Sequence, residues 1–198
     1  MSLKPDLTEP LCTWNNGQKA VVHLVHNSNG EPQIQKIYKP GFTGWMLREY
    51  IGLWYVSKRL SVVPKPIRFR PWKREIIMSY VSGERVLEWV LKHFGQPDLH
   101  LEEFLNFEAM DADSRIVEAF ARFRESSSHD ASKLKHAIKE SYGRLHALGW
   151  QHGTSDPRNV IYDGNQAHII DFDHARPSLS PVELDYQALR YWFGLSPN

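Results

Sequence analysis

The residues whose side chains could bind a metal ion or accept a proton lie at the two ends of one predicted β-hairpin. Asp156 and Asn159 precede its first strand, residues 160–162, and Asp171 and Asp173 follow its second strand. Because a hairpin brings its ends together, Asn159 and Asp171 are expected to lie side by side. Amide and carboxylate oxygens suit Mg²⁺ when substrate phosphates supply its remaining ligands. A further Asp there could accept the proton of an attacking hydroxyl, so the pattern predicts a phosphoryl-transfer site.

The elements that must position these side chains have clear sequence signals. Residues 160–162 and 167–170 are β-prone runs, and Asp163-Gly164 between them is a strong turn signal. A helix is predicted just before the loop, because apolar residues recur there at helical spacing, at Leu134, Ile138, Tyr142, Leu145 and Leu148. Gly149 follows as a helix stop.

The stretch LHALGWQHG, followed by PRN and IIDFDHA, resembles the catalytic and metal-binding loops of the protein-kinase-like superfamily. The resemblance implies that ATP is the phosphate donor and that Asn159 and Asp171 hold Mg²⁺. It also implies that His152 is a buried loop residue bonded to backbone. Asp185, in the last predicted helix, resembles the buried Asp that braces the catalytic loop.

One position departs from the superfamily pattern. The usual catalytic Asp stands two residues after the His and five before the Asn, where this chain has Thr154. Either the loop is rearranged and Asp156 is the base, or the chain is a pseudokinase without one. Pro157 disfavours a helical conformation at Asp156, so an extended loop could turn this carboxylate toward Asp171, with Thr154 turned away. Asp156 has a second interpretation, as an Asx-turn residue ahead of the proline.

The N-terminal part resembles the small lobe of a kinase. Residues 20–26 and 33–39 are β-like runs joined by a turn at 27–30, and another strand is expected around residues 11–14. The glycine-rich phosphate loop of the superfamily is reduced to Gly17, whose backbone could still contact phosphate.

Two lysines compete for the role of the strand lysine that clamps the α- and β-phosphates. Lys36 and Lys39 point to opposite faces of the strand, so only one can face the nucleotide. We favour Lys36, because Ile34 and Tyr38 give it an apolar setting on its own face. Lys39 is the alternative.

A helix is predicted over residues 44–60. Its expected apolar face consists of Leu47, Tyr50, Ile51 and Trp54. Glu49 resembles the helix glutamate that pairs with the strand lysine, although a first-turn acid also favours the helix dipole.

A Pro- and Arg-rich connection over residues 64–74 leads to a predicted buried strand over residues 75–81. Its end resembles the hinge between kinase lobes. Met78 would line the back of the adenine pocket, and the backbone of Ser79, Tyr80 and Val81 would bond the adenine edge.

The remaining elements are helical. Residues 85–94 and 116–123 are predicted helices, and substrate contacts are expected between residues 84 and 130. The run at 180–183 combines an N-cap, a Pro at the first helical position and a capping-box Glu ahead of a helix that ends at Gly194. Few residues separate Asp173 from this helix, so we expect no long regulated activation loop.

Composition excludes several classes of function. The chain has 198 residues, enough for one domain or two small lobes, and its formal net charge is +1, which gives no attraction to nucleic acid or an acidic membrane. Cys12 is the only cysteine, so no disulfide framework exists and a reducing compartment is expected. No apolar run approaches roughly 18 residues. The chain is expected to be a monomer.

The predicted fold is α+β, a minimal two-lobed protein-kinase-like fold. Residues 1–10 are expected to be a flexible leader, 11–80 the small lobe and 81–198 the large lobe. The small size together with HGTSDPRN and IDFDHA resembles the HopBF family of type III-secreted effector kinases. That resemblance implies delivery into the host cytosol and phosphorylation of the ninety-kilodalton heat-shock chaperone. A small-molecule kinase and a pseudokinase acting as a binding module are the alternatives.

Overall fold

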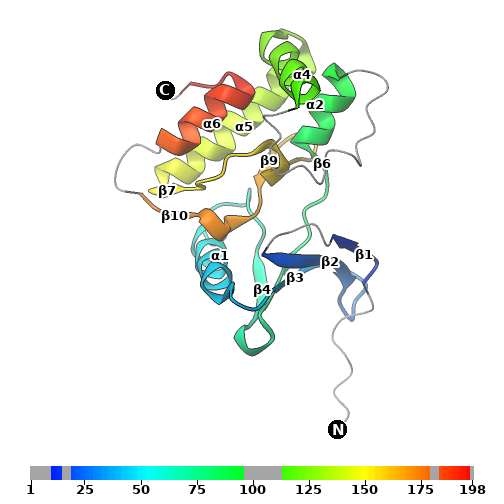
Figure 1. Cartoon of the computed structure of the whole chain (residues 1–198), viewed down its shortest axis with the longest axis vertical. Coiled ribbons are helices and arrows are strands. Elements are labelled where there is room, and N and C mark those ends of the chain that lie inside the picture. The colour runs from blue at the N-terminus through cyan, green and yellow to red at the C-terminus, as the bar shows by residue number, and fades with distance from the viewer. Residues whose placement is uncertain (1–9, 15–18, 96–112, 179–182, 197–198) are drawn as a thin grey trace. The chain divides into compact units, whose positions relative to one another are not determined.

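The computed structural model describes residues 10–14, 19–95, 113–178 and 183–196 (Figure 1). Contacts divide the chain into two compact units. Unit 1 comprises residues 1–81 with 172–174, and unit 2 comprises residues 82–171 with 175–198. The predicted leader, apart from residue 10, lies outside the described residues, as do Gly17 and the predicted helix start at 180–182.

Unit 1 is built on a five-stranded antiparallel sheet with the order β1-β2-β3-β5-β4. The strands are β1 (Cys12–Trp14), β2 (Ala20–His26), β3 (Pro32–Tyr38), β4 (Pro66–Arg70) and β5 (Glu75–Ser79). Lys36 on β3 lies opposite Val22 on β2 and Ile76 on β5. The predicted strands of unit 1 are therefore confirmed. Because β3 is paired on both sides, its alternate side chains must point to opposite faces of the sheet.

The strand β4 lies within residues 64–74, where the sequence predicts only a connection. It forms the edge of the sheet and pairs only with β5. An edge strand tolerates a proline at its first residue, because one side of its backbone needs no ladder partner. Arg68 and Arg70 interrupt the apolar run at residues 66–70, so the sequence shows no clear strand signal there. A short 3₁₀ turn, η1 (Pro71–Lys73), links β4 to β5.

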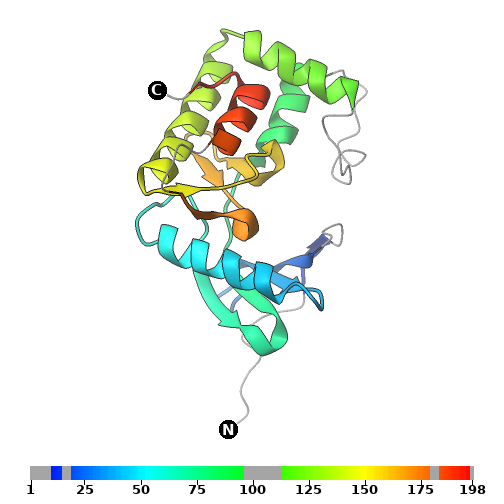
Figure 2. The same ribbon diagram turned by 60° about the vertical axis from the view of Figure 1, so that its left-hand side comes forward.

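The helix α1 (Thr43–Val56) lies across the sheet and contacts β4 and β5 (Figure 2). This helix was predicted, although it ends four residues earlier than expected, at Val56 rather than at residue 60. Of its predicted apolar face only Tyr50 packs, since its ring stacks on that of Phe69 in β4. The buried residues are Met46, Glu49, Gly52, Leu53 and Val56, while Leu47, Ile51 and Trp54 are exposed. Apolar side chains surround much of this helix, so periodicity alone could not select the face that packs. The short 3₁₀ turn η4 (Phe172–His174) also packs against α1.

Unit 2 is mainly helical in its described part. It contains α2 (Val86–Phe94), α4 (Ser114–Glu125), α5 (His129–Ala147) and α6 (Glu183–Phe193), and α5 and α6 run side by side in Figures 1 and 2. The hydroxyl of Ser128 caps α5 by accepting from the Ala131 N–H. Among the core side chains with no exposed surface are Phe120, Phe123, Ile138, Leu145 and Phe193.

Short strands hold the loops of unit 2. The strands β8 (Val160–Tyr162) and β9 (Ala167–Ile169) form the predicted hairpin, with Val160 opposite Ile169. Asp163 closes its turn by accepting from the N–H groups of Asn165 and Gln166. The strand β6 (Glu84–Arg85) extends this sheet, and β7 (Trp150–Gln151) pairs with β10 (Arg176–Pro177). No helix in the described ranges is long and apolar enough to cross a lipid bilayer.

Candidate active site

The rim of the hairpin in unit 2 brings Asn159 next to the residue that precedes Asp171. The Ile170 N–H donates to the carbonyl of Asn159 at 2.9 Å, which closes the base of the hairpin. The side-chain nitrogen of Asn159 faces Thr154, at 3.4 Å from both its carbonyl and its hydroxyl oxygen. The Asn159 amide oxygen is therefore the group on this side chain suited to a cation.

Asp171 has a left-handed backbone conformation, with φ of 63°. Only a few per cent of residues other than glycine adopt this region, and Asp is among those that tolerate it best. Such a conformation persists only where the surrounding structure imposes it, and it is common at functional sites. Asp171 directly precedes the η4 turn (Phe172–His174) in the sequence.

A buried carboxylate braces the loop that carries the polar residues. Asp185 has no exposed surface and accepts from the backbone N–H groups of His152 and Gly153, at 2.7 Å each. The ring of His146 lies 3.0 Å from the same carboxylate. Burial alone would raise the pKa of Asp185, but the bonds from His146, His152 and Gly153 outweigh it and hold the pKa below its usual value. The loop backbone is thus tied to α6.

The predicted environment of His152 is confirmed. The ring has no exposed surface, and its two nitrogens lie 2.9 Å from the Thr154 carbonyl and 2.8 Å from the Ile170 carbonyl. It therefore joins the loop to the second strand of the hairpin. Thr154 contacts both His152 and Asn159, so the expectation that it is turned away from the site is wrong.

The carboxylate of Asp156 is engaged by its own loop. Its Oδ1 accepts from the Arg158 N–H at 2.8 Å and caps the 3₁₀ turn η3 (Pro157–Asn159), which is the Asx-turn alternative. Its Oδ2 lies 2.7 Å from the Arg158 guanidinium. The backbone at Asp156 is extended, as its position before Pro157 predicts, with φ of −82° and ψ of 138°.

Arg158 was not singled out from the sequence, although it stands only two residues after Asp156. Its hydrogen bond to Asp156 is the main cause that raises its pKa, and the charge of Asp171 raises it further. The guanidinium therefore places a fixed positive charge near both acids. It also means that Asp156 would have to act as a base while it remains ion-paired.

In unit 1, Lys36 and Glu49 form the predicted pair. The Lys36 ammonium lies 2.8 Å from the Glu49 carboxylate, and the two side chains are 12% and 1% exposed. The Tyr38 hydroxyl donates to the same carboxylate, and its ring lies beneath the Lys36 ammonium. Glu49 is thus a buried acceptor on α1 that fixes an amine on β3.

The other residues of unit 1 that were predicted to contact the nucleotide differ in how far they are buried. Met78 is buried on β5, Tyr80 is 40% exposed just beyond that strand, and Val81 is partly buried. Val81 is also the last residue of the first segment of unit 1. Lys39 follows β3, where its backbone N–H donates to the Lys19 carbonyl at 2.8 Å.

A second ion pair in unit 1 involves an acid that the sequence placed at the hairpin rim. The Lys19 ammonium lies 2.8 Å from the carboxylate of Asp173, which is 4% exposed, and 2.8 Å from the ring of His174. The ring of Trp45 on α1 lies 3.9 Å from this ammonium. Asp173 therefore fixes the η4 turn within unit 1 and is not a further free acid beside Asp171.

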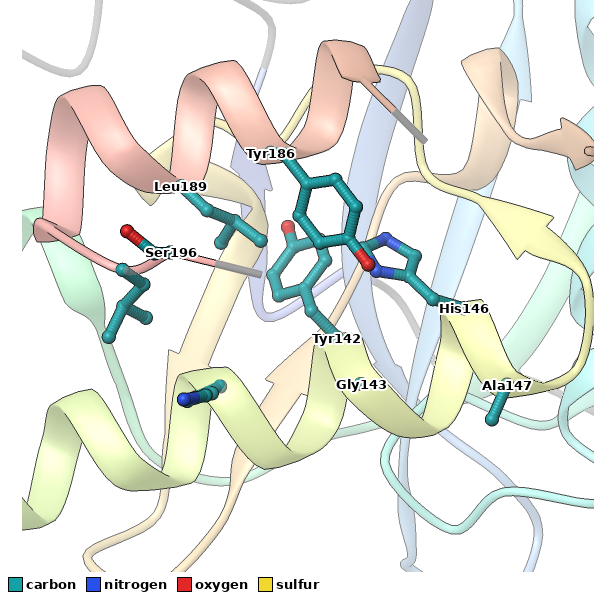
Figure 3. Close-up of a pocket in the computed structure, with 9 residues that line it drawn as sticks. Tyr142, Gly143, His146, Ala147, Tyr186, Leu189 and Ser196 are labelled. Carbon is teal, nitrogen blue, oxygen red and sulfur yellow. The ribbon is translucent and has the colours of Figure 1, made fainter. Parts of the chain in front are cut away.

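Figure 3 shows a pocket of about 380 Å³ between α5 and α6 of unit 2. The rings of Tyr142, His146 and Tyr186 form part of its wall. None of the residues predicted to bind nucleotide or metal lines it. The pocket is therefore separate from the residues predicted to bind nucleotide and metal, although His146 also contacts Asp185.

The described residues contain no group of three or more His, Cys, Asp or Glu side chains that could hold a metal ion. Asn159 and Asp171 alone would supply only two ligands. Their chemistry fits Mg²⁺ bound together with phosphate oxygens, because Mg²⁺ in nucleotide sites takes few ligands from the protein.

No family model matches this sequence, and no curated protein matches it. Solved structures do match. The chain resembles the Rio2 kinase of Chaetomium thermophilum, whose structure is a complex with ADP/Mg²⁺ and phosphoaspartate, with a TM-score of 0.59 and 14% sequence identity. The match covers 98% of this chain and 58% of the Rio2 chain, so this chain spans little more than half of that kinase's length. The fold is thus protein-kinase-like, as the sequence predicts.

Proposed function

We propose that this chain is a Mg-ATP-dependent phosphotransferase. The observation that carries the proposal is the pairing of Lys36 with the buried Glu49, because an amine held at 2.8 Å from a buried carboxylate is fixed in position. The hairpin rim supports it independently, with Asn159 and the left-handed Asp171 on adjoining backbone. The Rio2 kinase, which shares the fold, was solved with ADP and Mg²⁺.

Each residue has a proposed role. In unit 1, Lys36 would hold the α- and β-phosphates, with Glu49 setting its direction. The backbone near Tyr80 and Val81 would bond the adenine, with Met78 behind it, and Gly17 would contact phosphate. In unit 2, Asn159 and Asp171 would hold Mg²⁺, whose chemistry is to neutralise the charge that develops on the transferred phosphoryl group.

Asp156 is the proposed residue that orients the attacking hydroxyl and takes its proton. Its ion pair with Arg158, with Oδ2 2.7 Å from the guanidinium, holds the carboxylate in place within the loop. A carboxylate has about four lone-pair directions, so it can accept from Arg158 and from a substrate hydroxyl together.

The finer proposal is a protein acceptor. The resemblance to the HopBF effector kinases leads us to propose a secreted enzyme that phosphorylates a host protein, the ninety-kilodalton heat-shock chaperone. A small-molecule kinase and a pseudokinase are the competing candidates, and Thr154 in the usual position of the catalytic Asp is what favours the latter.

One experiment separates these candidates. The purified chain is incubated with labelled ATP, Mg²⁺ and a eukaryotic cell lysate. A labelled protein band supports the protein kinase, a labelled small molecule supports the small-molecule kinase, and no transfer supports the pseudokinase. The matched controls are Lys36→Ala and Lys39→Ala, of which only the first is expected to abolish transfer. If Lys39→Ala is the inactive variant, the two lysines exchange roles.

A further inference from the structure

The outward face of α1 carries three large apolar side chains that remain exposed. Leu47, Ile51 and Trp54 are exposed by 47%, 48% and 47%. Their spacing of four and three residues aligns them in one row along the helix, here called the outer stripe. The opposite face of α1 packs within unit 1. The outer stripe is therefore a second apolar face, and no described residue buries it.

The exposed charges on α1 and in the turn after it are all positive. Glu49, the only acid of α1, is buried and pairs with Lys36. The exposed charged residues of α1 and of the turn after it are Arg48, Lys58 and Arg59. Each lies over an aromatic ring, with Arg48 5.1 Å from Trp45, Lys58 3.4 Å from Trp54 and Arg59 4.0 Å from Tyr55. Within the part of the chain that the structure describes, no ion pair neutralises these three cations.

We propose that the outer stripe is a docking surface for an acidic amphipathic helix of a protein partner. The apolar side chains of that helix would cover Leu47, Ile51 and Trp54. Its carboxylates would lie beside Arg48 on the helix and beside Lys58 and Arg59 in the turn that follows it. The row is about 10 Å long, at about 1.5 Å per residue, and matches two turns of a partner helix.

Two features of this surface restrict the occupant. A second copy of the chain would bring one cationic flank against another, which disfavours self-association. Three side chains offer far less than the roughly 800 Å² per partner of a standard stable interface, so the contact suits a partner that binds and leaves. Docking at this surface does not require phosphoryl transfer, so the two proposals can be tested independently of each other.

The test uses two labelled peptides of sixteen residues, each with leucines at helical spacing. One carries glutamates on its polar face and the other carries lysines at the same positions. Fluorescence anisotropy is expected to show that the acidic peptide binds at least about tenfold more tightly than the basic one. The variant Ile51→Ser/Trp54→Ser should lose at least about tenfold in affinity for it, the loss typical of removing interface anchors. Ile67→Ser, an equally exposed change on β4, is the matched control and should bind as the unchanged chain does.

Several results would overturn the proposal. Equal affinity for the two peptides would show that the basic residues do not select the partner. Unchanged binding by Ile51→Ser/Trp54→Ser would show that the peptide does not bind at the outer stripe. A dimer in sedimentation that Trp54→Ser abolishes would make a second copy the occupant. Binding to phosphatidylserine vesicles that the same change abolishes, without binding of the acidic peptide, would make a membrane the occupant. Circular dichroism checks that each variant is folded.

Discussion

The ammonium of Lys19 and the carboxylate of Asp173 lie 2.8 Å apart, although 154 residues separate them in the sequence. The pair closes a loop of contacts in unit 1 that includes the rings of Trp45 and His174. It fixes the turn that directly follows Asp171. A residue outside the predicted site thus positions the backbone next to a proposed metal ligand.

Removing one partner of this pair should destabilise unit 1. Lys19→Met leaves the buried Asp173 without its main compensating charge, and we expect a loss of about 2 kcal/mol, below the value for fully buried pairs because Lys19 is partly exposed. The double variant Lys19→Met/Asp173→Asn should recover part of this loss. Urea unfolding of the four proteins measures the coupling. Strictly additive effects would show that the pair contributes no stability.

The role of Asp156 can be separated from its capping contact. Asp156→Asn keeps an oxygen for the Arg158 N–H, so the 3₁₀ turn should remain, but an amide cannot take a proton. If Asp156 is the base, turnover should fall about 10²-fold with little change in ATP affinity. Steady-state kinetics with nucleotide titration measures both. A fully active Asp156→Asn would reduce this carboxylate to a structural cap.

The Asp185 brace predicts a particular pH dependence of stability. Because the folded pKa of Asp185 is lowered, the native state releases this proton more readily than the unfolded chain. Its contribution is therefore present above the unfolded pKa of about 3.9 and is lost as pH falls through the folded value. We expect Asp185→Asn to cost about 3 kcal/mol at neutral pH, since three hydrogen bonds to a buried charge are disturbed. The difference from the unchanged protein should shrink in acid, and a difference that stays constant from pH 7 to pH 3 would contradict this origin.

The sequence predicted most elements because their local signals agree with their packing. The hairpin has turn residues between two β-prone runs, and α5 has one apolar face and a terminal glycine. Local signals failed where packing selected between alternatives. Two faces of α1 are apolar, and only the sheet of unit 1 determines that Leu53 and not Ile51 is buried.

The contacts of the candidate site could also be predicted where they are local in sequence or follow from the resemblance, and not elsewhere. The position of Asn159 beside the Ile170 backbone follows from hairpin geometry, and the pairing of Lys36 with Glu49 follows from the resemblance. The contact between Lys19 and Asp173 could not be predicted, because no periodicity links residues so far apart. The ion pair of Asp156 with Arg158 is local, and the Asx-turn pattern ahead of Pro157 was its visible sign.

The most direct test of phosphoryl transfer is the variant Asp171→Ala. The labelled-ATP assay should show no transfer, because the charge of the bound phosphates would lose its compensating metal. Circular dichroism should remain that of the unchanged protein, and titration with a fluorescent ATP analogue should show that Mg²⁺ no longer strengthens nucleotide binding. Asp163→Ala, which changes an acid in the turn of the same hairpin, is the control and should keep its activity if the hairpin remains folded. If Asp171→Ala transfers phosphate at the unchanged rate, the assignment of this chain as a Mg-ATP-dependent phosphotransferase is contradicted.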